Sequence, residues 1–422
     1  MTNDNWASAA GQEAGEAGGA LPRTPDGSVS VTVGVEEEYL VVDPVSRQVS
    51  PEAEKVVALA AAKLGERVTT EFTCYQVEVR TDPHTSLTRL GDQLRSTRAV
   101  VSRAAARLGL AVISSGTPVL GQRTPPPITP GDRYAQSVAT YGALDHEQTV
   151  CAAHVHIGVP DETTAVQLSN HLRPWLPALI AMTANSPYWD GQDTGYASWR
   201  TTTWGRWPVA GPPPYFTSRD HFQTLVDTLV TSGTVMDRGS LYWDIRPSHH
   251  VPTLEVRIAD ALPTVTDTVL LAGVIKGLAA TAFTAIRRSQ PAPKPGSEIL
   301  RAACWRAAHD GLAGDTINLR TGRLEPAAVL NKRLADTVRA ALGAADLASL
   351  QAAQRHLLTH GNGADRQRAA YRQRRHLPDV VDHLIHSMTA LDYCRHSVSD
   401  RQDASDAPCL LPPHTHHSNG PT

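Results

Sequence analysis

The segment "VGVEEEYLVV" (residues 33–42) places three consecutive glutamates inside a stretch that otherwise has the composition of a β-strand. Side chains of a strand alternate between its two faces, so Glu36 and Glu38 share one face and Glu37 lies on the opposite, mainly apolar face. The pattern therefore predicts a strand that carries a pair of carboxylates on one side.

Three further predicted strands also carry polar residues on a single face. They are Gln76, Glu78 and Arg80 in "CYQVEVRT", His154 and His156 in "CAAHVHIGV", and Glu255 and Arg257 in "PTLEVRIAD". If these strands are neighbours, their glutamates crowd together. Two carboxylates about 4 Å apart repel by roughly 4 kcal/mol at an effective dielectric constant near 20. Such a cluster requires cations.

Carboxylate oxygens with a histidine nitrogen and no thiolate suit Mg²⁺, or alternatively Mn²⁺, better than zinc. Because these ions commonly bind substrate phosphates, we expect a phosphate-bearing ligand. Arginines that could bind phosphate or carboxylate with two hydrogen bonds are Arg80, Arg200, Arg246 and Arg257. The interpretation that these arginines only neutralise the glutamates stays open. There is no Walker A or GxGxxG motif, so a nucleotide would have to lie on the sheet.

The composition argues against several classes of protein. The chain has 422 residues with 39 Lys+Arg and 42 Asp+Glu, a formal charge of −3, so we expect neither nucleic-acid binding nor attraction to an anionic membrane. Five scattered cysteines without CxxC pairs predict a reduced, cytoplasmic protein. The N-terminus does not resemble a signal peptide, and no uninterrupted run approaches 18 apolar residues, so membrane insertion is not expected.

Hydrophobic periodicity predicts an α+β architecture, with strands early in the chain and helices late. The predicted strands are 30–42, 72–81, 110–115, 149–159 and 252–260, and the predicted helices are 51–64, 86–108, 163–183, 219–231 and 266–288. After the linker at 289–297 we expect helices alone. The aromatic, Gly- and Pro-rich segment 184–216 is predicted to be a functional loop.

The termini differ in composition from the rest of the chain. Residues 1–28 are predicted to be a disordered leader, 29–395 a single catalytic domain whose part 289–395 is mainly helical, and 396–422 a disordered tail.

These stretches, in this order, resemble the glutamate–cysteine ligase family, specifically its bacterial type 2 branch of carboxylate–amine ligases. The resemblance runs from about residue 33 to 285 and is carried by "GVEEEYLVVD", "QVEVRTDP", "DRYAQ", "CAAHVHIGVP", "NSPYWDGQDTGYASWR" and "WDIRPSHHVPTLEVRIAD". It implies a fold of the glutamine synthetase type. The expected sheet is curved and mostly antiparallel, with ATP and two or three Mg²⁺ ions on its concave face, helices on its convex face and a helical C-terminal part. Family members also suggest a homodimer.

The resemblance also implies roles for individual residues. Metal ligands are implied at Glu36, Glu38, Glu78, His154 and Glu255. Catalytic roles near the transferred phosphate and the substrate carboxylate are implied for Arg200, Arg257 and His154. Contacts to substrate or nucleotide are implied for Arg80, Arg133, Tyr134, His156, Tyr196, Ser198 and Arg246. His156 departs from the better-studied branch, where an asparagine is usual, so it is carried only as a neighbour of the site.

The implied reaction has two steps. The γ-phosphate of ATP passes to a substrate carboxylate to give an acyl phosphate, and an amine then attacks to form an amide. The leading expectation is glutamate–cysteine ligase activity on a small-molecule acid and amine. One alternative is the same chemistry with a different acid and amine in specialised metabolism. Others are a metal-dependent amidohydrolase, indicated by His154-x-His156, and a non-catalytic nucleotide- or peptide-binding protein.

Overall fold

The central sheet brings together segments from the first 260 residues of the chain. The computed structural model describes residues 30–389, so the predicted leader and the predicted tail both lie outside the described residues. The strands are β1 Val33–Val42, β2 Val68–Thr70, β3 Gln76–Arg80, β4 Ala111–Ile113, β5 Ala152–Gly158, β8 Ile245–Pro247 and β9 Thr253–Asp260. Their order is β2-β3-β1-β5-β9-β8, and β4 also pairs with β1.

Every pair of neighbouring strands in this sheet is antiparallel. All five predicted strands are present, and the α+β prediction is confirmed. The short strands β2 and β8 were not predicted. An amidohydrolase barrel would have required repeated parallel strands, so the sheet gives that alternative no support.

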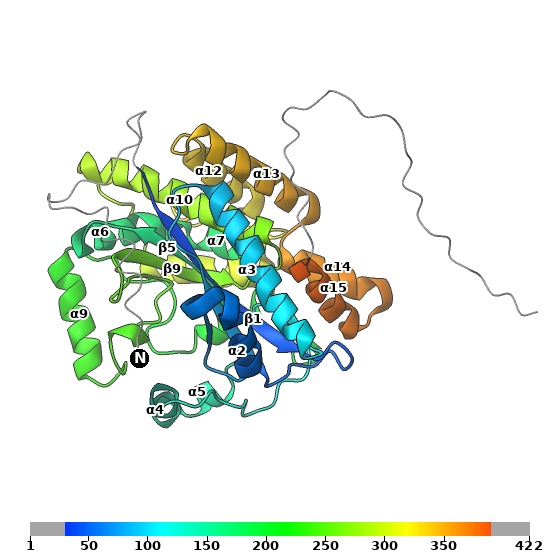
Figure 1. Ribbon diagram of the computed structural model, residues 1–422. Coiled ribbons are helices and arrows are strands. Elements are labelled where there is room, and N and C mark those ends of the chain that lie inside the picture. Colours follow the sequence, from blue (N-terminus) through cyan, green and yellow to red (C-terminus); the bar gives the residue numbers. More distant parts are fainter. Residues whose placement is uncertain (1–29, 390–422) are drawn as a thin grey trace, which may run out of the picture. The chain divides into compact units, whose positions relative to one another are not determined.

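Helices cover the apolar face of the sheet, as Figure 1 shows for α3, α6, α7 and α10. The valines of β1 and β5 pack there with leucines of these helices in the largest hydrophobic core. The helices are α2 Ala53–Leu64, α3 Leu87–Arg107, α6 Glu162–Leu172, α7 Leu176–Thr183, α9 Arg219–Thr231 and α10 Val265–Arg287. The predicted helix 163–183 is divided by a 3-10 turn at Arg173–Trp175, where Pro174 lacks a backbone donor.

Helix α10 is the core helix of the fold. Thr264 and Asp267 form a capping box at its first turn, which satisfies backbone donors at its start. Among residues 30–389 it is the one helix long and apolar enough to cross a membrane, but 78% of that window is buried within the protein. Packing against β1, β5 and several helices accounts for its apolar composition.

The C-terminal part is not purely helical, which corrects the prediction. Helices α11 Ser297–Asp310, α12 Ala327–Arg339, α13 Ala344–His360, α14 Gly363–Arg374 and α15 Leu377–Thr389 are interrupted by a hairpin of β10 Asp315–Ile317 and β11 Leu324–Pro326. Its turn is closed by Asn318, whose side chain accepts hydrogen bonds from two backbone amides, and by Gly322 at φ +69°.

The segment predicted to be a long loop, 184–216, is partly ordered into regular structure. It contains the short strands β6 Tyr188–Trp189 and β7 Gln192–Asp193 and the helix α8 Trp199–Trp204. Between β4 and β5 the chain also forms α4 Asp132–Tyr141 and α5 Ala143–His146, which lie beside the face of the sheet that carries the polar residues.

Candidate active site

The strand register places the predicted polar residues beside one another. Glu36 of β1 lies opposite Arg80 of β3 on one side and His154 of β5 on the other. Glu38 lies opposite Glu78, and His156 lies opposite Glu255. Four separate segments of the sequence therefore contribute to a single polar face.

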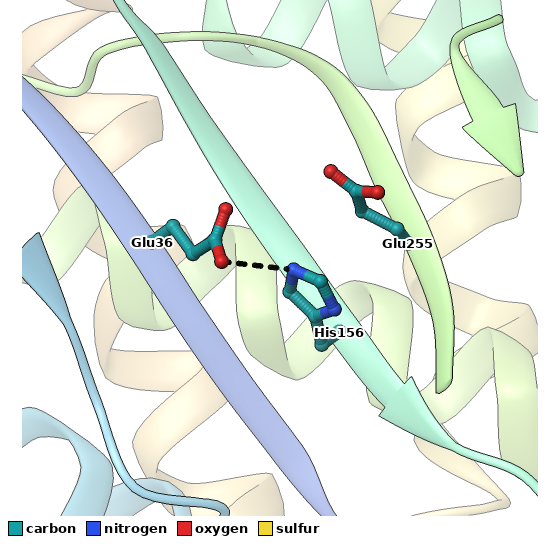
Figure 2. Close-up of side chains that lie close together, drawn as sticks. All are labelled: Glu36, His156 and Glu255. Carbon is teal, nitrogen blue, oxygen red and sulfur yellow. Dashed lines mark ion pairs between the residues drawn. The ribbon is translucent and has the colours of Figure 1, made fainter. Parts of the chain in front are cut away.

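A compact group of side chains of the kinds that can ligate a metal ion lies at the centre of this face. Candidate ligand atoms of Glu36, His156 and Glu255 all lie within 4.8 Å of one another, and Figure 2 shows these side chains converging from β1, β5 and β9. His156 Nε2 is 3.5 Å from Glu36 Oε1. His154 Nδ1 is 3.2 Å from Glu36 Oε2 and 3.7 Å from Glu255 Oε1.

Arginines surround Glu255. Its carboxylate accepts a hydrogen bond of 2.7 Å from Arg246 Nε and another from Arg257 Nη1. Burial alone would raise the pKa of Glu255, but Arg246 and Arg257 outweigh burial and hold that pKa below its usual range. This carboxylate is therefore ionised at neutral pH. Arg246 also donates to the carbonyls of Gly239 and Leu241, so it holds β8 in place as well.

The carboxylates toward β3 lack comparable cations. Burial and the nearby Glu71 raise the pKa of Glu38 to about 8, although Arg200 opposes the shift. Burial and repulsion from Glu36 and Glu71 raise the pKa of Glu78 well above its usual value, and its Oε1 lies 3.6 Å from Arg80 Nε. Additional positive charge at this place would stabilise the ionised forms.

The donor set fits a divalent cation that prefers oxygen ligands. Five carboxylates gather here with His154, whose buried Nε2 has no hydrogen-bond partner among the described residues. Burial and Arg257 lower the pKa of His154 to about 4, so its imidazole is neutral and can offer a lone pair. Many carboxylates with a neutral imidazole match Mg²⁺ or Mn²⁺. The carboxylates are Glu36, Glu38, Glu71, Glu78 and Glu255.

A cavity of about 240 Å³ opens beside this cluster. Glu38, His154, Arg200 and Arg257 contribute to its polar wall. The aromatic wall consists of Phe72, Tyr134, Trp204, Trp207 and Tyr242. The cavity can therefore accept a molecule that has both charged and apolar parts.

Helix α4 contributes Arg133 and Tyr134, which the "DRYAQ" block predicted, to the cavity wall. Tyr134 packs edge-to-face against Phe72 with 5.5 Å between ring centroids, and its hydroxyl bonds to the Glu71 carboxylate. Arg133 forms an ion pair with Asp237. Tyr134 thus connects this helix to the acidic cluster.

Arg200 of α8 lies against the edge of β9. It is 3% exposed and donates to the carbonyls of Ile258 at 3.3 Å and Arg257 at 3.1 Å. Its Nε has no hydrogen-bond partner among the described residues.

Two residues predicted to contact substrate or nucleotide, Tyr196 and Ser198, do not line this cavity. Ser198 caps α8 and donates a 2.8 Å hydrogen bond to Asp260, and Tyr196 packs against His309 with 4.8 Å between ring centroids. The structure therefore brings neither to the acidic cluster. Both were implied by the family resemblance of the block "NSPYWDGQDTGYASWR", and a matching block does not show which way each of its side chains points. Arg80 remains beside Glu78 and also donates to the Glu66 carbonyl.

Sequence reasoning missed Glu71 and Asp145. Glu71 lies in the connection between β2 and β3, outside the alternation that identified the other acids, so periodicity offered no signal for it. Asp145 of α5 is 1% exposed, lines the cavity and accepts a 2.9 Å hydrogen bond from Ser137. Burial raises the pKa of Asp145 to about 6.

A family model and two similar proteins all point to the same family. Residues 32–383 match the family described as "Glutamate-cysteine ligase family 2". The chain is 44% identical to a protein of Saccharopolyspora erythraea over 85% of this chain and 94% of that protein. It is 43% identical to one of Nocardia farcinica over 81% of this chain and 88% of that protein. Both carry the name "Putative glutamate--cysteine ligase 2-1".

Two solved structures resemble the whole described fold. Glutamate–cysteine ligase of Francisella tularensis, in complex with AMP, has a TM-score of 0.64 at 13% identity and covers 86% of this chain and 90% of its own. A bifunctional glutathione synthetase of Pasteurella multocida has a TM-score of 0.62 at 15% identity and covers 85% of this chain and 52% of its own. At these identities the likeness concerns the fold, and it confirms the predicted fold class.

Proposed function

The chain belongs to glutamate–cysteine ligase family 2, and from this premise we propose that it is an ATP-dependent carboxylate–amine ligase that forms an amide through an acyl phosphate. We further propose glutamate as the acid and cysteine or a related amine as the acceptor. The observation that supports the proposal most is the convergence of Glu36, His156 and Glu255 beside a cavity walled by Arg200 and Arg257.

The acidic cluster is the proposed place for Mg²⁺. Glu36, Glu38, Glu71, Glu78 and Glu255 would hold it together with His154, whose neutral imidazole offers an unused nitrogen. Mg²⁺, when bound, neutralises the phosphate charge of ATP and the mutual repulsion of the carboxylates. Bound AMP in the Francisella tularensis ligase supports ATP as the nucleotide of this fold.

The arginines are proposed to stabilise charge on the acid and on the phosphoryl group. In the first step an oxygen of the substrate carboxylate forms a bond to the γ-phosphorus, and the bond between that phosphorus and ADP breaks. Arg257 and Arg200 line the cavity at the sheet edge, where a guanidinium can bind carboxylate or phosphate with two hydrogen bonds. Both side chains are held by neighbouring groups, so little reorganisation is needed.

In the second step the amine nitrogen bonds to the acyl carbon, the bond from that carbon to the phosphate oxygen breaks, and phosphate and a proton are released. The aromatic wall of Trp204, Trp207 and Tyr242 is proposed to exclude water from the acyl phosphate. Water would otherwise hydrolyse this intermediate without forming an amide.

The same aromatic wall favours a second candidate function, in which the enzyme joins the acid to an amine other than cysteine. Three large rings and the buried carboxylate of Asp145 offer more apolar surface and more negative charge than a small thiol needs. A cytoplasmic location, predicted from the cysteine composition, and a homodimer, suggested by the resemblance, stay predictions.

The test is an assay of ADP release with Mg²⁺, ATP, L-glutamate and a panel of amines that includes cysteine and hydroxylamine. Hydroxylamine reacts with an acyl phosphate whichever natural acceptor the enzyme uses, and the hydroxamate product identifies the activated acid. We expect ADP release that requires both acid and amine. If no acid and amine in the panel elicit ADP release or hydroxamate, the proposed function is wrong.

A further inference from the structure

Arg200 is carried by α8, a helix of six residues. A helix this short is not stable by itself, so its place is set by contacts with the rest of the fold. The Arg200 guanidinium donates to the carbonyls of Arg257 and Ile258, one bond from each terminal nitrogen. Because each of these nitrogens carries two hydrogens, the guanidinium can also donate into the cavity that it lines. The position of α8 therefore decides where this cation lies in the cavity wall.

The carboxylate of Asp260, the last residue of β9, joins the two ends of the segment that leads into α8. Its Oδ2 accepts hydrogen bonds of 2.7 Å from the Asn185 amide and from the Ser186 hydroxyl. Its Oδ1 accepts a bond of 2.8 Å from the Ser198 hydroxyl. All four residues are at most 1% exposed, so water does not compete for these bonds. One buried carboxylate thus closes the loop between positions 186 and 198.

The two serines connect this carboxylate to the first turn of α8. The Ser186 hydroxyl accepts from the Arg200 amide at 3.1 Å, and the Ser198 hydroxyl accepts from the Thr201 amide at 3.2 Å. Each hydroxyl therefore donates to Asp260 and accepts from the helix. The backbone of Arg200 is held by the same strand that holds its guanidinium.

The surroundings of Asp260 are shaped for a carboxylate. A Cβ at position 116 would lie 2.7 Å from Asp260 Cγ, so this close approach requires Gly116. Burial raises the pKa of Asp260, while the charge of Arg200 and the hydrogen bonds from Asn185, Ser186 and Ser198 oppose that shift. The side chain is therefore coupled to Arg200 both through hydrogen bonds and through charge.

The Asn185 side chain holds the start of the segment independently of Asp260. It donates to the carbonyls of Ser114 at 3.0 Å and Ala261 at 2.7 Å, and it accepts a 2.7 Å bond from Gln367 of α14. Loss of the Asp260 carboxylate would leave these bonds in place. We therefore expect such a change to loosen α8 rather than to unfold the protein.

We propose that Asp260 is a positioning residue of the ligase, which holds α8 so that the Arg200 guanidinium faces the reacting carboxylate and phosphoryl group. The proposal rests on the ligase function proposed above, which gives Arg200 its role in the reaction. Asp260 does not line the cavity and acts through Ser186 and Ser198. Displacement of a reacting or charge-stabilising group by about 1 Å can lower a rate by about 100-fold.

The experiment is a double-mutant cycle of Asp260→Asn and Arg200→Gln, with hydroxamate formation from L-glutamate, hydroxylamine and ATP as the assay. Asparagine keeps the shape of the side chain but replaces one accepting oxygen by an NH₂ group. Asp260→Asn should lower kcat/KM for L-glutamate by about 30-fold and keep KM for ATP within about threefold of wild type, because Mg²⁺ and the acidic cluster hold the nucleotide in the proposed function.

In the Arg200→Gln background, Asp260→Asn should change kcat/KM by less than about threefold, because the group that it positions is already absent. Arg200→Gln alone should lower kcat/KM by about 100-fold or more. Losses that multiply in the double variant would show that the two residues act independently, and would overturn the proposal.

Asp267→Asn is the matched control. Asp267 is another buried carboxylate, which caps α10 and pairs with Arg366, and it does not line the cavity. This variant should lower the free energy of unfolding but keep kcat/KM within about threefold of wild type. If Asp260→Asn behaves in the same way, its carboxylate serves stability alone and the proposal is wrong.

Ser186→Ala serves as a second variant should Asp260→Asn fail to fold. It removes the hydroxyl between Asp260 and the Arg200 amide and keeps the carboxylate. We expect kcat/KM to fall by about tenfold, and by less than about threefold in the Arg200→Gln background. Unchanged kcat/KM in Ser186→Ala would contradict the proposed connection.

Hydrogen exchange followed by mass spectrometry separates this proposal from the proposed function, because it requires no substrate. In Asp260→Asn the amides of residues 185–204 should exchange about tenfold faster than in wild type, and in Asp267→Asn they should not. If no acid yields hydroxamate, the ligase function fails, but faster exchange confined to this segment would still support the anchoring of α8. If hydroxamate forms while exchange and kcat/KM are unchanged in Asp260→Asn, the ligase function stands and the positioning role is wrong.

Discussion

Glu37 and Arg98 form a buried ion pair on the helix-covered side of β1, opposite the face that carries Glu36 and Glu38. Both side chains are at most 2% exposed, and Arg98 Nε donates to Glu37 Oε2 at 3.1 Å. Thr268 of α10 and Tyr39 also donate to this carboxylate. Three consecutive glutamates therefore serve two purposes, and the middle one joins β1 to α3 and α10.

Replacing Glu37 by Gln should destabilise the fold by about 3 kcal/mol, because Arg98 would remain buried without its counter-charge. Urea unfolding followed by circular dichroism measures this free energy. Glu52→Gln breaks a surface pair with Lys55 and should change the free energy of unfolding by less than about 0.5 kcal/mol. A loss of the same small size in both variants would show that the buried pair contributes little.

The same ion pair predicts a dependence of stability on pH. Burial raises the pKa of Glu37, but Arg98 and the hydrogen bonds from Thr268 and Tyr39 outweigh it, so the folded-state pKa lies below the usual value. The folded state then binds fewer protons than the unfolded state, and stability is lost as the pH falls below the unfolded pKa of about 4.3. The difference in unfolding free energy between wild type and Glu37→Gln should shrink from pH 6 to pH 3. A constant difference would contradict this assignment.

Much of this arrangement was predictable, because period-two alternation decides which side chains share a face. The separation of Glu36 from Glu37, and the shared face of His154 and His156, follow from that rule alone. Strand order does not, since the pairing of β1 with β5 joins residues more than 100 positions apart and depends on packing of the whole core. The expectation that these strands are neighbours in one sheet came from the family resemblance.

Other parts of the site could not be read from periodicity. Glu71 lies in a tight connection where no regular alternation applies, and Asp145 lies on a four-residue helix too short for a hydrophobic pattern. Ser198 and Tyr196 show the converse case, since they were predicted to contact substrate or nucleotide but do not lie at the acidic cluster. Their segment does reach the site through Arg200, but a turn and the cap of α8 direct these two side chains elsewhere.

Tyr134→Phe should raise the Mg²⁺ concentration needed for half-maximal activity by about tenfold, because Glu71 loses the hydrogen bond that orients it. ADP release measured across a series of Mg²⁺ concentrations at fixed ATP tests this. Tyr215→Phe is the control, since the Tyr215 ring faces the ammonium of Lys294 at 4.9 Å and does not line the cavity beside the acidic cluster. If both variants require the same Mg²⁺ concentration as wild type, Glu71 does not take part in metal binding.

Glu255→Gln should weaken Mn²⁺ binding by about tenfold or more, because the substitution removes a negatively charged candidate ligand from the group with Glu36 and His156. Isothermal calorimetry with Mn²⁺ in the absence of nucleotide measures the affinity. The matched control Glu147→Gln alters a half-exposed carboxylate that pairs with Arg206 at 2.6 Å. Unchanged affinity in Glu255→Gln, or equal weakening in both variants, would place the metal elsewhere.

The most direct test of the account compares two adjacent substitutions in β1. Wild type, Glu36→Gln and Glu37→Gln are assayed for ADP release with L-glutamate, hydroxylamine and Mg²⁺, under conditions where each variant is shown to be folded. Glu36→Gln should lower kcat/KM by about 100-fold or more, because it removes a carboxylate from the group with His156 and Glu255. Glu37→Gln should keep kcat/KM within about threefold of wild type, since its carboxylate faces Arg98. Equal losses in the two variants, or full activity in Glu36→Gln, would contradict the assignment of this face as the active site.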